Sequence, residues 1–395
     1  MIGSLLAHKR CECVTYLLLA LTSLIVVAAG AGCDAGKTSE EGEQSASLTE
    51  TWRYPFSFEM TAPRVRPTAY TRGGEEHVLF GAGGHVVSAQ LDDGAVEWKS
   101  KLDPFFELKC HSFVLSESRA FCSHLEKAVA WNLDSGDQEW TFSSTRNEYG
   151  RRFYDTGYVA LGPSHFYGSA GGGWLYALER TSGEVAYKQQ FDHLPRGLAY
   201  NHGALYVVQA WTPEGAEGQS QGGIMKVDAA TGDSLWNFRT ERGGVYRMRP
   251  IVRDGVVYAG TRGGEKTAFY ALDAETGEVI WENRGVRVYA AEWAGGTIVV
   301  NDGRDLMGID AENGQTIWRT DMPGAHGEGG IAYHDGYVYH PHAGPLAVVD
   351  VETGEVVHTE PPVRGSYYWV VGTGADKVFA QTSGALVAFE PYSAR

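Results

Sequence analysis

The sequence predicts an all-β fold, an eight-bladed β-propeller, from three observations. A phrase of about a dozen residues recurs seven times, most cleanly as YALDAETGEVIW at 270–281. The copies follow one another at the spacing of a propeller blade. The two ends of the 395-residue chain supply the two halves of an eighth unit.

Each copy of the phrase predicts a β-hairpin. A run of alternating or apolar residues turns through Asp, Thr or Ser and Gly, and a second run then ends in an aromatic residue or, in the last copy, a histidine. Asp and Thr side chains can bond to the backbone of the turn, and Gly accepts the positive φ that branched residues resist. The seven turn glycines are Gly94, Gly136, Gly183, Gly232, Gly277, Gly314 and Gly354.

A second pair of strand-like runs precedes each hairpin, so each unit holds four strands. The turn glycines are separated by 42, 47, 49, 45, 37 and 40 residues, which suits one four-stranded blade. A single blade cannot bury both of its faces, whereas a closed ring of blades can. We expect the Trp at the end of each fourth strand to pack against the neighbouring blade.

The chain ends predict the eighth blade. GALVAFE at 384–390 resembles a third strand without its partner, and TWRYP at 51–55 resembles a fourth strand without its beginning. Their pairing closes the ring, removes the exposed edge strands and divides residues 51–395 into eight units of about 43 residues. A seven-bladed ring is the alternative. Residues 51–395 are therefore expected to form one propeller domain.

The pattern of alternating hydrophobic residues followed by D-x-x-T-G-x-x-x-W resembles the pyrroloquinoline-quinone-type (PQQ-like) propeller repeat. The resemblance covers nearly the whole chain after residue 50. This repeat occurs in quinoprotein alcohol dehydrogenases and in non-enzymatic propellers, including the lipoprotein subunit of the outer-membrane β-barrel assembly machinery. The resemblance therefore specifies the fold strongly and the function weakly.

Residues 1–32 resemble a bacterial lipoprotein signal peptide. A basic segment at 8–10 precedes an apolar run at 14–29, and small residues then lead to Cys33, although Gly30 stands where leucine is usual. The resemblance implies that Cys33 is lipidated. An uncleaved anchor is the alternative, because an apolar run of about 18 residues can span a bilayer. Both interpretations place the propeller outside the cytoplasm, on the periplasmic side or at the cell surface, and leave inner or outer membrane open.

Residues 33–50 are small, polar and acidic, which predicts a flexible tether after the lipidated cysteine. The whole chain has a net charge of −16, and removal of Lys9, Arg10 and Glu12 with residues 1–32 leaves −17. Broad nucleic-acid binding is not expected at this charge.

Two of the five cysteines remain as a pair in the propeller. Cys110 and Cys122 lie in two strand-like runs around a turn at 116–118, so their sulfur atoms can face each other across a hairpin. In an oxidising compartment this arrangement predicts a disulfide. Two buried free thiols are the alternative, because a slip in register would separate the sulfur atoms.

Basic residues recur just before or at the first strand of successive units. In a propeller these strands line the central channel, so the residues are expected to form a ring at one mouth, a cationic funnel on an acidic body. The alternative is that each arginine pairs with a carboxylate of a neighbouring blade, such as Glu241, Glu292 or Asp155. The predicted funnel residues are Arg66, His111, Arg152, Arg196, Arg249, Arg287, Glu328 and Arg364.

No catalytic residues are predicted. Quinoprotein dehydrogenases carry a vicinal cysteine pair over the cofactor, and this chain has no adjacent Cys-Cys. PQQ binding, and any cofactor, is therefore not expected. His340 and His342 have a spacing that can chelate a metal, but Pro341 separates them and no third ligand is evident. Surface or packing roles are preferred, and no metal site is predicted.

Two function classes remain. The first is a membrane-anchored, non-enzymatic scaffold that binds a protein partner in the envelope, as in outer-membrane protein assembly. The second is a receptor for a small anionic ligand or glycan in the funnel, or an enzyme subunit that acts on one. The longest insertion between strands, 211–223, is a candidate docking loop for a partner.

Overall fold

A computed structural model describes residues 48–56, 65–102, 112–124, 127–143, 159–170, 172–212, 214, 221–240, 243–245, 248–263, 266–322, 330–342, 344–362 and 368–393. All regular secondary structure in these ranges is β-strand. None of the described residues forms a helix long and apolar enough to cross a membrane. The chain divides into a first unit, 1–44, which lies outside the described residues, and a second, compact unit, 45–395, which holds all of them. The predicted signal segment, Cys33 and most of the predicted tether lie outside the described residues.

The described strands of the second unit form eight antiparallel sheets of four strands, which confirms the eight-bladed prediction. The first four blades are β2 to β5 (Thr68–Arg72, Glu75–Ala82, His85–Gln90, Val96–Lys101), β6 to β9 (Val114–Leu115, Arg119–His124, Lys127–Asn132, Gln138–Ser143), β10 to β13 (Ala160–Leu161, His165–Ala170, Trp174–Glu179, Val185–Gln190) and β14 to β17 (Leu194–Asn201, Ala204–Trp211, Gln221–Asp228, Ser234–Arg239).

Blades five to eight continue the same order around the ring. They are β18 to β21 (Ile251–Arg253, Val256–Gly260, Ala268–Asp273, Val279–Arg284), β22 to β25 (Ala290–Ala294, Thr297–Asn301, Asp305–Asp310, Thr316–Asp321), β26 to β29 (Ala332–His334, Tyr337–Pro341, Leu346–Asp350, Val356–Glu360) and β30 to β32 (Val370–Thr373, Val378–Gln381, Ala385–Phe389) with β1 (Glu50–Pro55).

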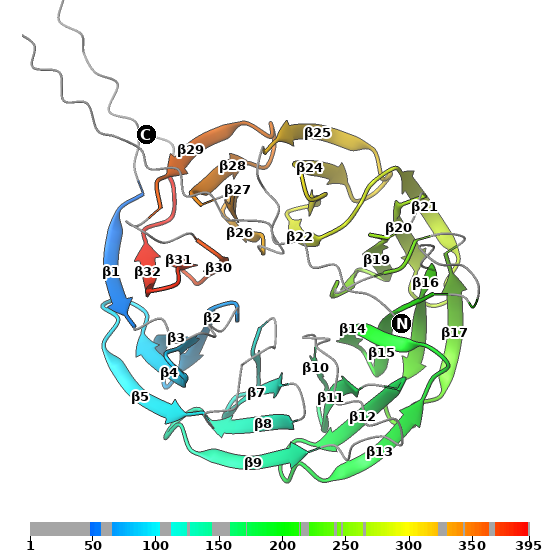
Figure 1. The fold of residues 1–395 in the computed structure, drawn as a ribbon, viewed down its shortest axis with the longest axis horizontal. Helices are drawn as coiled ribbons and strands as arrows, with labels where there is room; N and C mark the ends of the chain where they lie inside the picture. The colour runs from blue at the N-terminus through cyan, green and yellow to red at the C-terminus, as the bar shows by residue number, and fades with distance from the viewer. Residues whose placement is uncertain are drawn as a thin grey trace, which may run out of the picture. The chain divides into compact units, whose positions relative to one another are not determined.

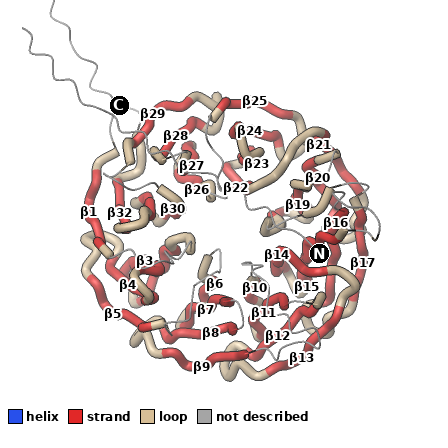
Figure 2. Tube along the Cα trace, viewed as in Figure 1, coloured by secondary structure: helices blue, strands red, loops and turns tan. Residues whose placement is uncertain are grey.

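Figure 1 shows the blades arranged as a ring, with the first strand of each blade toward the centre and the fourth at the circumference. The same arrangement is seen in the strand colouring of Figure 2. The two faces of the ring differ because every blade has the same strand order. One face, here called the turn face, carries the Asp–Gly turns. The other, here called the loop face, carries the connections from one blade to the next.

The predicted turn chemistry is present. Asp273 Oδ1 accepts hydrogen bonds from the backbone N–H groups of Thr276 at 2.7 Å and Glu275 at 2.9 Å. These bonds stabilise the charged carboxylate and lower the pKa of Asp273. Gly277 completes the turn with a φ of 76°. The recurrent Asp, Thr and Gly therefore close the turn through local hydrogen bonds and backbone conformation.

In seven blades the aromatic residue is the third residue of the fourth strand, not the last as predicted, and it packs on the turn glycine of the next blade. A Cβ placed on Gly136 would lie 2.4 Å from Cε3 of Trp98, and Trp98 Nε1 donates a hydrogen bond to Leu133 O at 2.9 Å. Glycine is thus required for its positive φ and for the space that the indole fills. The same contact joins Trp52, Trp98, Trp140, Tyr187, Trp236, Trp281 and Trp318 to Gly94, Gly136, Gly183, Gly232, Gly277, Gly314 and Gly354.

The ring closes through the chain ends. β1 pairs antiparallel with β32, with Trp52 opposite Ala388, so the eighth blade combines an N-terminal strand with three C-terminal strands. Trp52 Nε1 donates to Leu91 O at 2.8 Å and thereby joins this blade to the first. Glu50, at the start of β1, lies on the turn face, because it stands opposite Phe389 at the end of β32.

In the seventh blade the equivalent residue is His358 in β29, and the eighth blade has no Asp–Gly turn because its third and fourth strands, β32 and β1, are not consecutive in the sequence. The C-terminal segment takes the place of that turn. The ring of Tyr392 lies 6.3 Å from that of His358 and 4.9 Å from that of Tyr337. The backbone N–H of Tyr392 donates to the Tyr339 hydroxyl at 2.7 Å. Residues beyond the last strand therefore complete the contact between blades seven and eight.

Candidate binding face

Four of the eight predicted funnel residues are described, and all four lie where their connection reaches the first strand of a blade. Arg66 precedes β2, Arg249 precedes β18 and Arg287 precedes β22, while Arg196 is the extra residue of a bulge in β14. Arg249 and Arg287 are exposed, and Arg66 and Arg196 are half-buried. The other four, His111, Arg152, Glu328 and Arg364, lie outside the described residues.

Arg66 forms an ion pair with Glu292, whose Oε2 accepts a hydrogen bond from Nη1 at 2.8 Å. Glu292 belongs to β22 in the sixth blade, whereas Arg66 precedes the first blade. The two blades are three positions apart around the ring, so this contact spans the central region instead of joining neighbours. The alternative to a cationic funnel was that carboxylates such as Glu292 pair with arginines of a neighbouring blade; Glu292 does pair with an arginine, but with one from across the ring.

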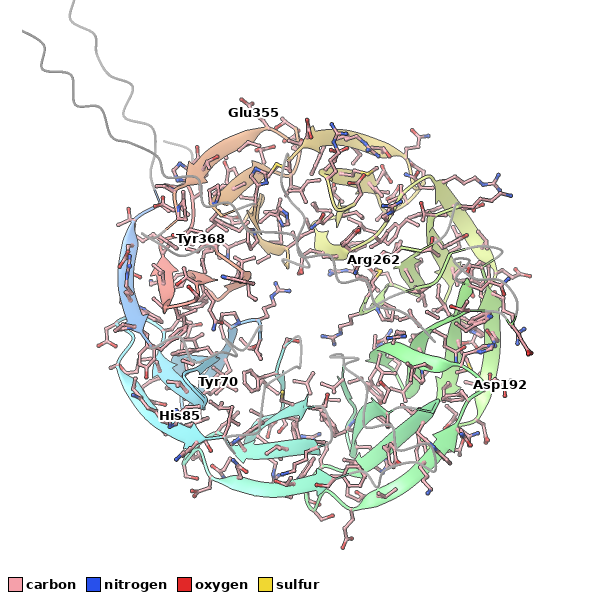
Figure 3. All side chains as sticks on the ribbon, in the orientation of Figure 1. Tyr70, His85, Asp192, Arg262, Glu355 and Tyr368 are labelled. Carbon is pink, nitrogen blue, oxygen red and sulfur yellow. The ribbon has the colours of Figure 1, made fainter. Side chains whose placement is uncertain are left out.

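A second arginine of the loop face lies against an aromatic ring. The guanidinium carbon of Arg262 is 3.8 Å from the centre of the Tyr289 ring, a cation–π contact between blades five and six. Figure 3 labels Arg262 beside the central opening. Tyr289 is itself held in place, because a Cβ on Gly303 would lie 2.5 Å from its ring. This pair adjoins the exposed Arg287 and gives the loop face a rigid cationic and aromatic surface.

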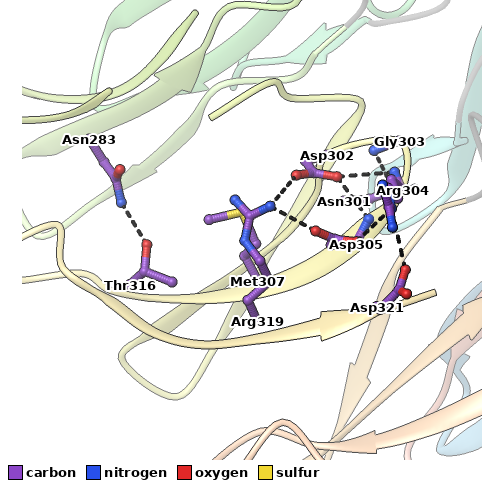
Figure 4. A network of polar contacts seen from close by, with 10 residues as sticks. All are labelled: Asn283, Asn301, Asp302, Gly303, Arg304, Asp305, Met307, Thr316, Arg319 and Asp321. Atoms are coloured by element: carbon purple, nitrogen blue, oxygen red, sulfur yellow. Dashed lines mark hydrogen bonds and ion pairs between the residues drawn. The ribbon is translucent and has the colours of Figure 1, made fainter. Parts of the chain in front are cut away.

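Beside this pair, the sixth blade carries a compensated group of charges, shown in Figure 4. Arg319 Nη1 lies 2.7 Å from Asp305 and 3.2 Å from Asp302, and Arg304 Nε lies 3.4 Å from Asp321. Asp302 also accepts the backbone N–H of Arg304 at 3.0 Å. These charged side chains neutralise one another. We therefore infer that they stabilise the turn between β23 and β24.

The insertion is shorter than the sequence predicted. Trp211 ends β15 and Gln221 begins β16, and the two residues are paired, so both strands extend into the segment that was expected to be a loop. The Trp211 ring stacks on His193 with centroids 3.9 Å apart, and Arg239 lies 5.9 Å from the Trp211 ring. Burial, together with the charge of Arg239, lowers the pKa of His193. The alternation of polar and apolar residues in the sequence does not predict this stack, because His193 lies in a different connection.

His340 and His342 do not form a metal centre with a third ligand among the described side chains. His340, in β27, is 1% exposed, and burial lowers its pKa to about 4. Burial also lowers the pKa of His342. His340 is therefore neutral at pH 7 and lies buried in the seventh blade.

Cys122 is buried in β7, with 1% exposure, and its sulfur is disulfide-bonded. Cys110 lies outside the described residues. The pairing of Cys110 with Cys122 therefore remains a prediction.

The architecture and the repeat define the class of protein, an eight-bladed propeller of PQQ-like repeats. Within that class, the chain belongs to the PQQ_2 family, described as outer membrane protein assembly factor BamB, whose model matches residues 82–269 and 220–367. Outer membrane protein assembly factor BamB of Yersinia pestis is 24% identical over 328 residues, which cover 78% of this chain and 80% of that protein.

A second relative is an enzyme. Lanthanide-dependent methanol dehydrogenase of Methylacidiphilum fumariolicum (strain SolV) is 26% identical over 179 residues, which are 40% of this chain and 27% of that protein. The chain therefore matches about a quarter of the enzyme's length.

Two solved structures illustrate the similarity of fold. BamB from Moraxella catarrhalis superposes with a TM-score of 0.63 at 12% identity and covers 87% of this chain and 100% of its own. A europium-containing methanol dehydrogenase superposes with a TM-score of 0.68 at 13% identity, over 87% of this chain and 93% of its own. At these identities the superpositions show the propeller fold alone.

Proposed function

We propose that this chain is a non-enzymatic scaffold, anchored in the cell envelope, that binds a protein partner in outer-membrane protein assembly. The observation that carries the proposal is the match of the assembly-factor family over residues 82–367. The similarity to the dehydrogenase covers a smaller part of this chain and a quarter of that enzyme. Sequence similarity that extends over most of both proteins supports a shared role better than one confined to the repeats.

The loop face is the proposed docking surface. Arg249 and Arg287 are exposed there, and Arg262 with Tyr289 forms a cationic and aromatic patch. Trp369, in the connection to the eighth blade, is 39% exposed. Arginine and aromatic side chains are enriched at protein interfaces, because each combines a large contact area with directional polar groups. The proposed partner presents acidic and apolar groups.

Membrane attachment through lipidated Cys33 is part of the proposal. The described chain reaches the ring at Glu50, on the turn face. A Cys33→Ala variant tests the anchor: it should no longer incorporate labelled fatty acid and should leave the membrane fraction.

The second candidate, a receptor for a small anionic ligand, is favoured by the exposed Arg249 and Arg287. The Arg66–Glu292 ion pair argues against it, because one arginine of the mouth is already neutralised by a carboxylate from across the ring. A protein partner can bind the exposed Arg249 and Arg287 without Arg66. The Arg66–Glu292 pair therefore does not weaken the scaffold proposal.

The test is crosslinked affinity capture of the full chain from envelope membranes, with proteins identified by mass spectrometry. A variant with Arg249→Ala and Arg287→Ala should lose at least tenfold of the captured assembly partner. Arg253→Ala is the matched control, because Arg253 ends β18 at the turn face of the fifth blade and its side chain is 55% exposed. Its capture should equal that of the wild type.

Equal capture by the loop-face variant would exclude this face as the docking surface. Capture of no outer-membrane assembly component would contradict the scaffold proposal. In that case, saturable binding of a small dicarboxylate or a sulfated glycan, lost in the loop-face variant and weakened by salt, would support the receptor.

A further inference from the structure

Three potential metal ligands converge on the turn face of the first blade, opposite the proposed docking surface. Glu75 and His77 lie on β3 and Glu97 lies on β5, and their ligand atoms are all within 4.8 Å of one another. The His77 side chain is 2% exposed. Its Nδ1 makes no hydrogen bond, although Glu97 Oε2 is 3.2 Å away. A buried imidazole nitrogen thus faces two carboxylates without a hydrogen bond of its own.

Strand pairing holds the imidazole ring in place. His77 stands opposite Tyr70 on β2, and the two rings stack with centroids 5.1 Å apart and planes at 30°. The hydroxyl of Tyr70 lies 2.7 Å from that of Ser88 on β4. Since these contacts fix the ring from one side, Nδ1 has little freedom to turn toward another acceptor.

A β-bulge places the second carboxylate. The register between β4 and β5 shifts between Ser88 and Ala89, which pair with Trp98 and Val96, so Glu97 is the extra residue. Glu97 Oε2 consequently lies near both His77, at 3.2 Å, and Ser88 Oγ, at 3.5 Å. The bulge directs Glu97 to the same group of side chains as His77.

Arg72, a cation close to Glu97, makes its short contacts with the second blade. Arg72 Nε lies 2.5 Å from Asp134 Oδ1, and its Nη1 donates to Leu133 O at 3.0 Å. The distance from Arg72 Nη1 to Glu97 Oε2 is longer, 3.6 Å. Arg72 therefore has its strong contacts elsewhere and leaves Glu97 available as a ligand.

The second and third blades show which residues occupy the positions equivalent to His77 and Glu97, and which contacts they make. In the second blade, Arg119 takes the place of His77, opposite Asn132, and its Nε donates to Glu139, the extra residue of the corresponding bulge. In the third blade, His165 lies 3.2 Å from Glu179, and the bulge residue there is Ala186. Within the described blades, the ligand set of one histidine and two glutamates is found in the first alone.

We infer that Glu75, His77 and Glu97 bind a divalent transition-metal ion of the Zn²⁺ type. An imidazole nitrogen with two carboxylates is a donor set that suits zinc, and three protein ligands leave a fourth position open. Bond lengths of about 2.0–2.2 Å place tetrahedral ligand atoms about 3.4 Å apart, so the exposed Glu75 moves inward by about 1 Å on binding. The sequence predicted no metal site because the ligands are spread over two strands without a local motif.

The test is calorimetric titration of metal-free full-length protein with Zn²⁺, repeated with Co²⁺ to record its visible spectrum. The wild type should bind one Zn²⁺ at this site. His77→Arg should weaken binding at least tenfold while it preserves the fold, because the new arginine reproduces the Arg119–Glu139 arrangement. Glu75→Gln should also weaken binding at least tenfold, and Glu75 is exposed, so the change does not disturb the core.

His165→Arg is the matched control, since it makes the same substitution at the equivalent position of the third blade, and it should bind Zn²⁺ as tightly as the wild type. The inference is overturned if the wild type binds no Zn²⁺. It is also overturned if His77→Arg and Glu75→Gln both bind Zn²⁺ as the wild type does, because the metal then lies elsewhere.

Discussion

Arg66 and Glu292 are 226 residues apart in sequence and 2.8 Å apart in the ring. Their blades are not neighbours, so the pair is a direct tie between two sides of the propeller. The contact is partly exposed, with 32% of the arginine side chain and 25% of the glutamate side chain accessible. The pair joins two sides of the ring and neutralises one arginine of the loop face.

We predict a favourable coupling between these two residues. A double-mutant cycle with Arg66→Ala and Glu292→Ala should give a coupling free energy of about 0.5–1 kcal/mol, because both groups are only partly desolvated. The free energy of unfolding in urea measures it, and added salt should reduce it. The Arg284–Glu282 pair on β21 is the control and should couple more weakly, because the Arg284 side chain is 83% exposed. Zero coupling for Arg66 and Glu292 would refute the tie.

The contact between Trp98 and Gly136 predicts that one methyl group added at Gly136 strongly lowers the stability of the ring. Gly136→Ala should destabilise the ring by about 2–4 kcal/mol, because it adds overpacking against the indole to the strain of a positive φ. Gly255→Ala is the control, since its φ of 78° matches the 75° of Gly136 but a Cβ there meets nothing within 4 Å. It should cost about 1 kcal/mol. Equal losses in urea denaturation would rule out the packing argument.

The contacts of Tyr392 predict that the last residues of the chain stabilise the closed ring. Tyr392→Ala removes the ring packing on His358 and Tyr337 and should lower stability by about 1–2 kcal/mol. Thermal unfolding monitors the change. Tyr392→Phe keeps the ring and the backbone N–H bond to Tyr339, so it should match the wild type. A melting temperature unchanged in the alanine variant would show that the segment adds nothing.

We predict that protonation of buried His340 causes part of the loss of stability in acid. Its folded pKa, about 4, lies below the ordinary value of 6.5, so the unfolded chain binds more protons between these pH values. The contribution of neutral His340 is full above pH 6.5 and is lost as pH falls toward 4, by at most about 3 kcal/mol. His340→Gln should flatten the slope of unfolding free energy between pH 7 and 5. An unchanged slope in His340→Gln would exclude this cause.

The sequence predicts a covalent link between Cys110 and Cys122. Peptide mapping of the unreduced protein should recover Cys110 joined to Cys122. Loss of the link in Cys122→Ala should cost about 3 kcal/mol of unfolding free energy, since the bridge closes a short loop in the unfolded chain. Reduction of the wild type should produce a similar loss. Recovery of Cys110 as an alkylated free thiol from protein prepared without reductant would refute the pairing.

The repeat made the ring predictable, because Asp, Thr and Gly act within one turn and the aromatic residue acts on the adjacent unit. The loop face was only partly predictable. The position of Arg66 followed from the repeat, but its partner did not, since Glu292 comes close only when all the intervening blades have closed the ring. The sequence predicts a loop from Trp211 onward, whereas Trp211 pairs with Gln221 at the ends of β15 and β16. The stack of Trp211 on His193 was not predictable, because His193 lies in a different connection.

The sequence by itself determined the eight blades, the turn glycines and the pairing of the chain ends, because these depend on local conformation and on contacts between successive units that the repeat reproduces. The tertiary structure alone decided which charges meet. Arg66 reaches Glu292 across the ring, and a bulge turns Glu97 toward the buried His77. Such contacts depend on the register and the curvature of packed strands, which residue patterns along the chain do not encode.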